Sequence, residues 1–302
     1  MSHSPPEARA TIAESAPRAV WELQAQLGEG PVWVERDSAL WFVDIKEKKI
    51  HRFDPASGAR RCWDSPEPCG FLFPAEGGGF VAGLQSGLYH FDEASGGFDL
   101  IARVEADKPG NRLNDGVVDP SGRLWFGTMD DREKDKTGAF YCFANGRVTP
   151  AGVNGITITN GPAVSPNGKL LYLVDTRRGT IRVADIDENG SLGEPRPFVR
   201  IDAKDGHPDG PTVDGEGCVW IALYAGWEAW RYSPSGALLE RVRFPAANIT
   251  KLAFGGPDLR TAFATTARQL LSAEQIAEQP LIGSLFEFRV GTPGLPCPLV
   301  RL

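Results

Sequence analysis

Short apolar runs separated by glycine- and proline-rich turns recur along the whole chain. An apolar triplet, aromatic in most copies, returns at spacings of 40, 44, 47, 48 and 43 residues. Turn sequences such as Asp119-Pro-Ser-Gly precede most copies, and a strand with alternating apolar residues, such as Thr180–Ala184, follows. The six triplets begin at Leu40, Phe80, Leu124, Leu171, Val219 and Ala262.

Repeats of about 45 residues that contain four short strands are typical of propeller blades. The pattern therefore predicts an all-β fold, a six-bladed β-propeller of four-stranded blades. A pair of β-sandwiches is the alternative, but it does not explain six repeats of one length.

A propeller must also close, because an open ring leaves unpaired strand edges. The strand-like run at residues 19–26 precedes the first unit, and we expect it to pair into the last blade. Residues 19–302 then form the propeller domain. Residues 1–18 lack a basic segment followed by an apolar one and are predicted to be a disordered tail. A helical pattern is expected only at residues 272–279.

The composition of the chain disfavours several classes of binding partner. A net charge of −7 and a pI near 5.3 disfavour nucleic acid and anionic membranes as partners. The chain has no apolar run of about 18 residues that could cross a membrane. Five cysteines without a CxxC pair indicate reduced thiols, so we expect a cytoplasmic protein. Separately, we expect a monomer.

The starts of the predicted inner strands carry polar residues at equivalent positions. In a propeller the first strand of each blade lines the central channel, so these positions converge at one end of it. The sixth unit, near Thr250, fits the alignment loosely. The other five read Glu29-Gly-Pro, Cys69-Gly-Phe, Asp115-Gly-Val, Asn160-Gly-Pro and Asp209-Gly-Pro.

Convergence would crowd Glu29, Asn160 and Asp209, with Asn114 and Asp115 beside them. Carboxylates that share a narrow channel raise one another's pKa unless a cation separates them. Oxygen ligands suit Ca²⁺, Mg²⁺ or Mn²⁺, so a divalent cation resolves the conflict. The alternative is that Asp-Gly and Asn-Gly are ordinary turn dipeptides.

Four motifs occur in order along the chain: LGEGPVW, NRLNDGVVDPSGRLWFGTM, ITNGPAVSPNGKLLY and PDGPTVDGEGCVW. With these motifs the chain resembles the regucalcin/gluconolactonase (SMP-30/gluconolactonase/LRE-like) family, and within it bacterial sugar lactonases such as xylonolactonase or arabinonolactonase. The resemblance implies one divalent metal on Glu29, Asn160 and Asp209, with Ca²⁺ expected first and Zn²⁺, Mn²⁺, Mg²⁺ or Fe²⁺ as alternatives. It also implies that Arg112 and Asn114 bind the substrate.

The same resemblance implies hydrolysis of a sugar lactone to the aldonic acid. The metal would polarise the lactone carbonyl, and Asp209 would act as general base towards the attacking water, with a metal-held hydroxide as the alternative. Asp130 or Asp131 would contact sugar hydroxyls. Asp115 would lie behind the ligands or order a water.

Other chemistries find little support. His207 lies near the expected site, but a loop histidine is more often structural than a base. A Gly-x-Ser-x-Gly elbow and nucleotide-binding glycine motifs are absent from the sequence. The remaining alternatives are a non-catalytic metal-binding regulatory protein, a protein-interaction propeller and a phosphotriesterase-like hydrolase.

Overall fold

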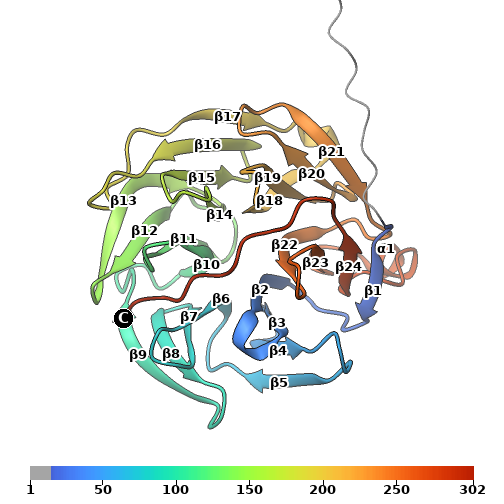
Figure 1. The fold of residues 1–302 in the computed structure, drawn as a ribbon, viewed down its shortest axis with the longest axis horizontal. Coiled ribbons are helices and arrows are strands. Elements are labelled where there is room, and N and C mark those ends of the chain that lie inside the picture. Colours follow the sequence, from blue (N-terminus) through green and yellow to red (C-terminus); the bar gives the residue numbers. More distant parts are fainter. Residues whose placement is uncertain (1–14) are drawn as a thin grey trace, which may run out of the picture.

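Six antiparallel sheets of four strands stand around a central axis in the computed structural model (Figure 1). The structure describes residues 15–302. The prediction of a six-bladed β-propeller is confirmed. The first blade contains β2 (Gly28–Val34), β3 (Ala39–Asp44), β4 (Lys49–Phe53) and β5 (Arg60–Asp64). The second contains β6 (Cys69–Pro74), β7 (Phe80–Leu84), β8 (Gly87–Asp92) and β9 (Gly97–Arg103), and the third β10 (Asn111–Val118), β11 (Leu124–Asp130), β12 (Gly138–Ala144) and β13 (Arg147–Ile156). The fourth contains β14 (Thr159–Val164), β15 (Leu170–Asp175), β16 (Thr180–Asp185) and β17 (Arg196–Arg200), and the fifth β18 (His207–Val213), β19 (Val219–Tyr224), β20 (Glu228–Tyr232) and β21 (Leu238–Arg243).

The sixth blade joins the two ends of the ring. Its strands are β22 (Ile249–Gly255), β23 (Thr261–Thr266), β24 (Leu285–Arg289) and β1 (Arg18–Trp21). β1 pairs antiparallel with β24, so the N-terminal strand closes the propeller as expected, although it ends at Trp21 rather than residue 26. Residues 1–14 of the predicted tail at 1–18 lie outside the described residues, and Arg18 at its end already belongs to β1.

Helical structure is confined to three short segments of the described chain: η1 (Glu35–Asp37), η2 (Ala203–Asp205) and α1 (Ala273–Ala277). α1 lies within the predicted helical segment, and Ser272 caps it by accepting a hydrogen bond from the Gln275 backbone N–H. In residues 15–302, no helix is long and apolar enough to cross a membrane.

The turns before the triplets repeat one local design. The buried carboxylate of Asp119 accepts hydrogen bonds from the backbone N–H groups of Ser121 and Arg123 and from the indole of Trp125. Asp214 accepts the equivalent bonds, including one from Trp220. Each such turn therefore anchors a fully buried tryptophan of the blade core.

The first strand of every blade lies innermost, as predicted, and each packs against its neighbours around the channel (Figure 1). Each of the six inner strands shows a register shift in its pairing with the second strand of its blade. These shifts fall at Glu29/Val32, Cys69/Phe71, Leu113/Gly116, Asn160/Ala163, Pro208/Pro211 and Ile249/Lys251. Such bulges redirect side chains, and here they occur where the candidate ligands stand.

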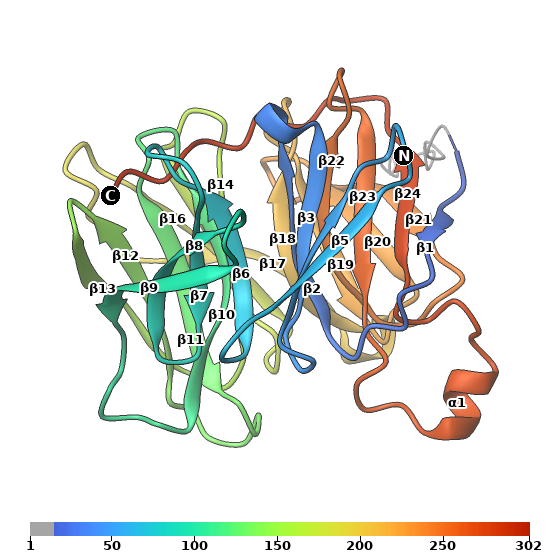
Figure 2. The same cartoon turned by 90° about the horizontal axis from the view of Figure 1, so that it is seen from below.

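The two ends of the channel differ. Figure 2 shows α1 beyond one end of the sheets and the C-terminal segment running across the other. That segment is fastened to the blades by backbone hydrogen bonds from Gly215 to Pro293, from Val300 to Pro74 and from Glu76 to Val300. The candidate ligands lie at the end that faces α1.

Candidate functional site

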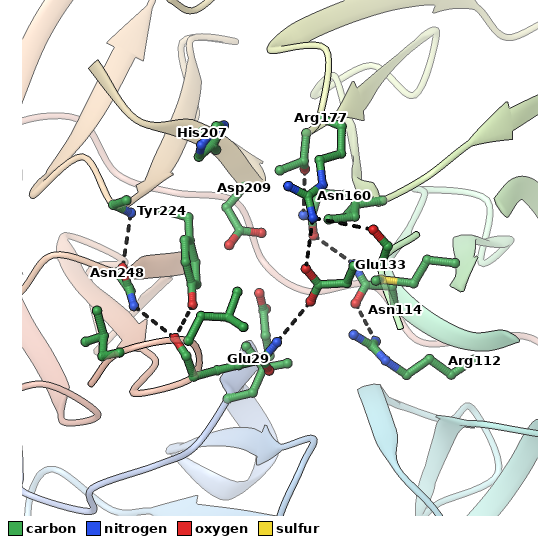
Figure 3. A pocket seen from close by; sticks show the side chains of 18 of the residues that line it. Glu29, Arg112, Asn114, Glu133, Asn160, Arg177, His207, Asp209, Tyr224 and Asn248 are labelled. Atoms are coloured by element: carbon green, nitrogen blue, oxygen red, sulfur yellow. Dashed lines mark hydrogen bonds and ion pairs between the residues drawn. The ribbon is translucent and has the colours of Figure 1, made fainter. Parts of the chain in front are cut away.

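A cavity of about 360 Å³ opens at the end of the channel that carries α1. Glu29 from β2, Asn160 from β14 and Asp209 from β18 line it together, and Figure 3 shows the three side chains around one space. Arg112 and Asn114 from β10 also line it. Five sequence-predicted residues from four blades thus meet in one cavity.

Among the carboxylates that line this cavity, Glu29 and Asp209 are buried, and burial disfavours their charged forms unless a cation compensates them. Burial raises the pKa of Glu29 to about 8, and the nearby Asp115 carboxylate adds to the rise. Burial also holds the pKa of Asp209 well above its usual range, reinforced by Glu29 and Asp115. Glu29 accepts one hydrogen bond, from the Gly30 backbone N–H at 2.8 Å. Asp209 accepts none from the residues that the structure describes.

Asn160 is oriented by a chain of hydrogen bonds. The Thr176 hydroxyl donates to the Pro208 carbonyl oxygen at 2.9 Å and accepts from Asn160 Nδ2 at 2.9 Å. Asn160 Oδ1 is left on the other side of the amide, where Asn114 Nδ2 donates to it at 3.0 Å. These hydrogen bonds fix the orientation of the amide, whose oxygen is the atom that a hard cation would bind.

These groups fit a divalent metal. In residues 15–302 no set of three His, Cys, Asp or Glu side chains is placed to hold an ion, so the fitting set is two carboxylates and an amide oxygen. All three donors are hard oxygens, which suits Ca²⁺ or a similar cation. A charge of +2 would balance Glu29 and Asp209.

Asp115 and Lys251 form a separate ion pair in the channel. Lys251 Nζ, from β22, binds the Asp115 carboxylate and the Gly116 carbonyl oxygen. The same carboxylate accepts the backbone N–H groups of Gly116 and Gly161, at 2.7 and 2.9 Å. The charge of Asp115 is therefore compensated by protein groups, and Asp115 does not line the cavity. Lys251 was not identified as a channel residue from the sequence, because it lies in the sixth unit, which aligned most loosely.

Arg112 is buried and held in a fixed orientation. Its Nε donates to Asp131 Oδ1 at 2.7 Å, and its Nη1 donates to Asn114 Oδ1 at 2.5 Å. Asp131 thus supports Arg112, together with Lys46, which binds the same oxygen at 2.7 Å. Asp130 is turned into its own loop, where its carboxylate accepts backbone N–H groups of residues 132, 134 and 135. It does not line the cavity.

The cavity mouth contains residues that the repeat alignment did not find. Glu133 accepts a hydrogen bond from Gln269 Nε2 at 2.9 Å, and Arg177 Nη2 lies 3.7 Å from its carboxylate (Figure 3). This group links loops of three blades. His207 and Tyr224 line the cavity as well. Glu133, Arg177 and Gln269 lie in loops, which have no fixed place in the 45-residue repeat, so the alignment carries no signal for these three.

Cys69 is a buried thiol. Its Sγ donates to the Phe71 carbonyl oxygen, and burial raises the pKa of the thiol to about 12. All five cysteines, which lie in the described part of the chain, are free.

The glycines after the ligands have a structural reason that the sequence did not reveal. Gly30 and Gly161 have φ of 53° and 71°, values that glycine adopts readily. A Cβ on Gly161 would lie 2.7 Å from Pro211 Cγ of the next inner strand. These glycines therefore let neighbouring inner strands approach closely at the bulges.

Comparison with known proteins assigns the family. Residues 27–268 match the model of the SMP-30/gluconolactonase/LRE-like region. The chain belongs to this family. The SMP-30/gluconolactonase relatives include a 6-deoxy-6-sulfogluconolactonase of Pseudomonas putida, 36% identical over 90% of this chain and 94% of that protein, and regucalcin of Danio rerio, 31% identical over 90% and 93%.

A solved family structure superimposes closely. The calcium-binding protein regucalcin from Agrobacterium tumefaciens has a TM-score of 0.93 and 32% identity, with 97% of this chain and all of that chain covered. Family membership supports hydrolysis of a sugar lactone as the class of activity, and a small molecule as the substrate. The calcium-binding relatives suggest a divalent metal.

Proposed function

We propose that this protein hydrolyses a sugar lactone to its aldonic acid with one divalent cation, Ca²⁺ expected first, bound by Glu29, Asn160 and Asp209. The observation that carries the proposal is the convergence of two buried carboxylates and one oriented amide oxygen in a cavity. The family relationship supports the same conclusion.

When bound, the cation would supply Lewis-acid polarisation of the lactone carbonyl and stabilise the charge that develops on its oxygen. Asp209 accepts no hydrogen bond from the described residues, so its carboxylate is available to take a proton from the attacking water. The water oxygen bonds to the carbonyl carbon, and the ring C–O bond breaks. The ring oxygen leaves as a hydroxyl after receiving the proton that Asp209 accepted.

Arg112 and Asn114 orient the sugar in this scheme. Arg112 donates through Nε and Nη1 within the protein, while Nη2 donates to no group that the structure describes and is free for a sugar hydroxyl. Asn114 fixes Arg112 and Asn160 together, because it accepts from one and donates to the other. Substrate orientation and metal binding are thereby joined in one hydrogen-bond network.

A lactone panel tests the proposal. Protein treated with a chelator would be assayed by acid release with gluconolactone, xylonolactone, arabinonolactone and 6-deoxy-6-sulfogluconolactone, with paraoxon for the phosphotriesterase alternative. Ca²⁺, Mg²⁺, Mn²⁺, Zn²⁺ and Fe²⁺ would be restored in turn. We expect hydrolysis of at least one lactone only with metal. Metal binding without turnover of any lactone would instead favour the regulatory alternative.

A further inference from the structure

A second hollow adjoins the lactone cavity on the side of blades four and five. It has a volume of about 460 Å³, and its charged and titratable lining is Arg177, Arg178, Arg200, Asp202 and His207. Arg177 and His207 line the lactone cavity too, so these two residues stand at the boundary between the two spaces. Figure 3 shows Arg177 and His207 on either side of the space above Asp209.

The backbone holds the arginines of this hollow together. Arg177 and Arg178 lie in the turn between β15 and β16, and Arg200 ends β17, where it pairs with Thr180. The Ile201 N–H donates to the Gly179 carbonyl oxygen at 2.8 Å, which fastens the turn to the end of β17. Gly179 has a φ of 65°, and a Cβ there would lie 2.5 Å from the Ile201 carbonyl oxygen. The turn is thus built to bring basic side chains side by side.

The charges of the hollow are only loosely compensated. Three arginines face one lining carboxylate, Asp202. The ion pair from Arg177 to Glu133 spans 3.7 Å and that from Arg178 to Asp175 spans 3.6 Å, with both arginines more than half exposed. Such pairs are weak. The side chain of Arg200 has no hydrogen bond or ion pair with any residue that the structure describes.

Guanidinium groups bind carboxylate, sulfonate and phosphate oxygens through paired hydrogen bonds, and a concave site strengthens the attraction. We infer that this hollow receives an anionic group at the end of the substrate farthest from the ester. The inference rests on the proposed function. The carbonyl would face Glu29 and Asp209, while the terminal anion would pass Arg177 towards Arg200. The preferred substrate would be an anionic aldonolactone rather than a neutral one.

Kinetics with matched lactones test this inference. Gluconolactone would be compared with its 6-phospho and 6-deoxy-6-sulfo counterparts, which share the ring and differ in the terminal group. We expect kcat/KM to favour at least one anionic lactone by about tenfold or more, mainly through KM, because each bidentate contact adds binding energy. The preference should shrink as NaCl is raised.

Variants locate the effect. Arg200→Gln should reduce the ratio of kcat/KM for anionic over neutral lactone by about fivefold or more, and Arg177→Gln provides a second test should the first variant fail to fold. Arg196→Gln is the matched control, because Arg196 lies on the same strand, β17, and pairs with Asp185 at the surface. That control should leave the ratio unchanged.

The alternative is that the hollow binds a separate anion rather than the anionic end of the substrate. Inorganic phosphate or sulfate should compete with the anionic lactone more than with the neutral one. Activation of neutral lactone hydrolysis by inorganic phosphate would instead assign the hollow to an effector and overturn the inference. Equal kcat/KM for neutral and anionic lactones would overturn the anion-site inference and leave the proposed lactonase function standing. Absence of any lactone hydrolysis would overturn both the inference and the proposed function.

Discussion

The acidic residues of the channel fall into two groups according to whether a protein cation compensates their charge. Glu29 and Asp209 face the cavity and lack a protein cation of their own, whereas Asp115 is compensated by Lys251. The three carboxylates interact electrostatically, since Asp115 raises the pKa of both Glu29 and Asp209, and Glu29 raises that of Asp209 as well. Their roles nevertheless differ, because only the first two have oxygens available to a metal.

Removal of one ligand charge should abolish metal binding and turnover together. Asp209→Asn keeps the side-chain volume but loses the anionic oxygen and the base. We expect metal affinity to fall by about 100-fold and lactonase activity to disappear. Calorimetry with Ca²⁺ and a rate assay would measure both. Glu188→Gln, an exposed residue away from the cavity, is the control for charge loss, and near-normal rates in Asp209→Asn would contradict the mechanism.

Loss of Lys251 should destabilise the fold. Lys251→Met would leave the Asp115 carboxylate buried without its cation, and we expect the free energy of unfolding to fall by about 3–5 kcal/mol. Urea denaturation would measure this change. Lys251→Met with Asp115→Asn should recover part of the loss, because the uncompensated charge is gone. A double variant as unstable as the single one would show that lost packing, not charge, dominates.

Individual strands show how far the sequence could predict the site. The repeat aligned Glu29, Asn160 and Asp209, because equivalent positions on β2, β14 and β18 must converge in any closed propeller. The common bulge could not be predicted, since it depends on pairing between strands. Lys251 was missed for a related reason: it follows Thr250 in the unit that aligned loosely, and its role depends on a partner on β10 that the repeat does not reveal.

Strand β4 carries a histidine that should make the protein sensitive to acid. His51 packs against Trp21 and Phe42, and burial lowers its pKa to about 4. In the unfolded chain the His51 imidazole binds a proton near pH 6.5, whereas in the folded protein it binds one only near pH 4. Stability should therefore fall as the pH drops through this window, by on the order of 3 kcal/mol in total.

His51→Leu tests this assignment. The variant cannot bind the proton in either state, so the difference in unfolding free energy from wild type should change between pH 7 and pH 4.5 in favour of the variant. Thermal melts at several pH values would measure it. The same difference at every pH would mean that His51 does not titrate on unfolding.

At the scale of the whole molecule, the ring of blades is closed by the N-terminal strand. β1 supplies the outermost strand of the sixth blade, and Trp21 reaches Phe42 and His51 of the first blade. The closing strand thus joins two blades that are distant in sequence. Sequence reasoning found this closure because an open ring leaves an edge, but residues at the cavity mouth such as Glu133 and Arg177 belong to loops outside the repeat and could not be placed.

Deletion of residues 1–21 should open the ring. The free edge of β24 would become available to other chains, so we expect a lower melting temperature and association that increases with protein concentration. Calorimetry and size-exclusion chromatography would follow both. Deletion of residues 1–14 alone is the matched control. A monomeric 1–21 deletion that melts like the control would contradict the closing role of β1.

Metal titration into chelated protein tests the central claim most directly. Bound metal and the rate of lactone hydrolysis would be recorded in the same samples as Ca²⁺ is added. The account predicts that both rise together and saturate at one metal per chain, and that Glu29→Gln abolishes both. Full lactonase activity in the chelated protein, or metal bound with equal affinity by Glu29→Gln, would contradict it.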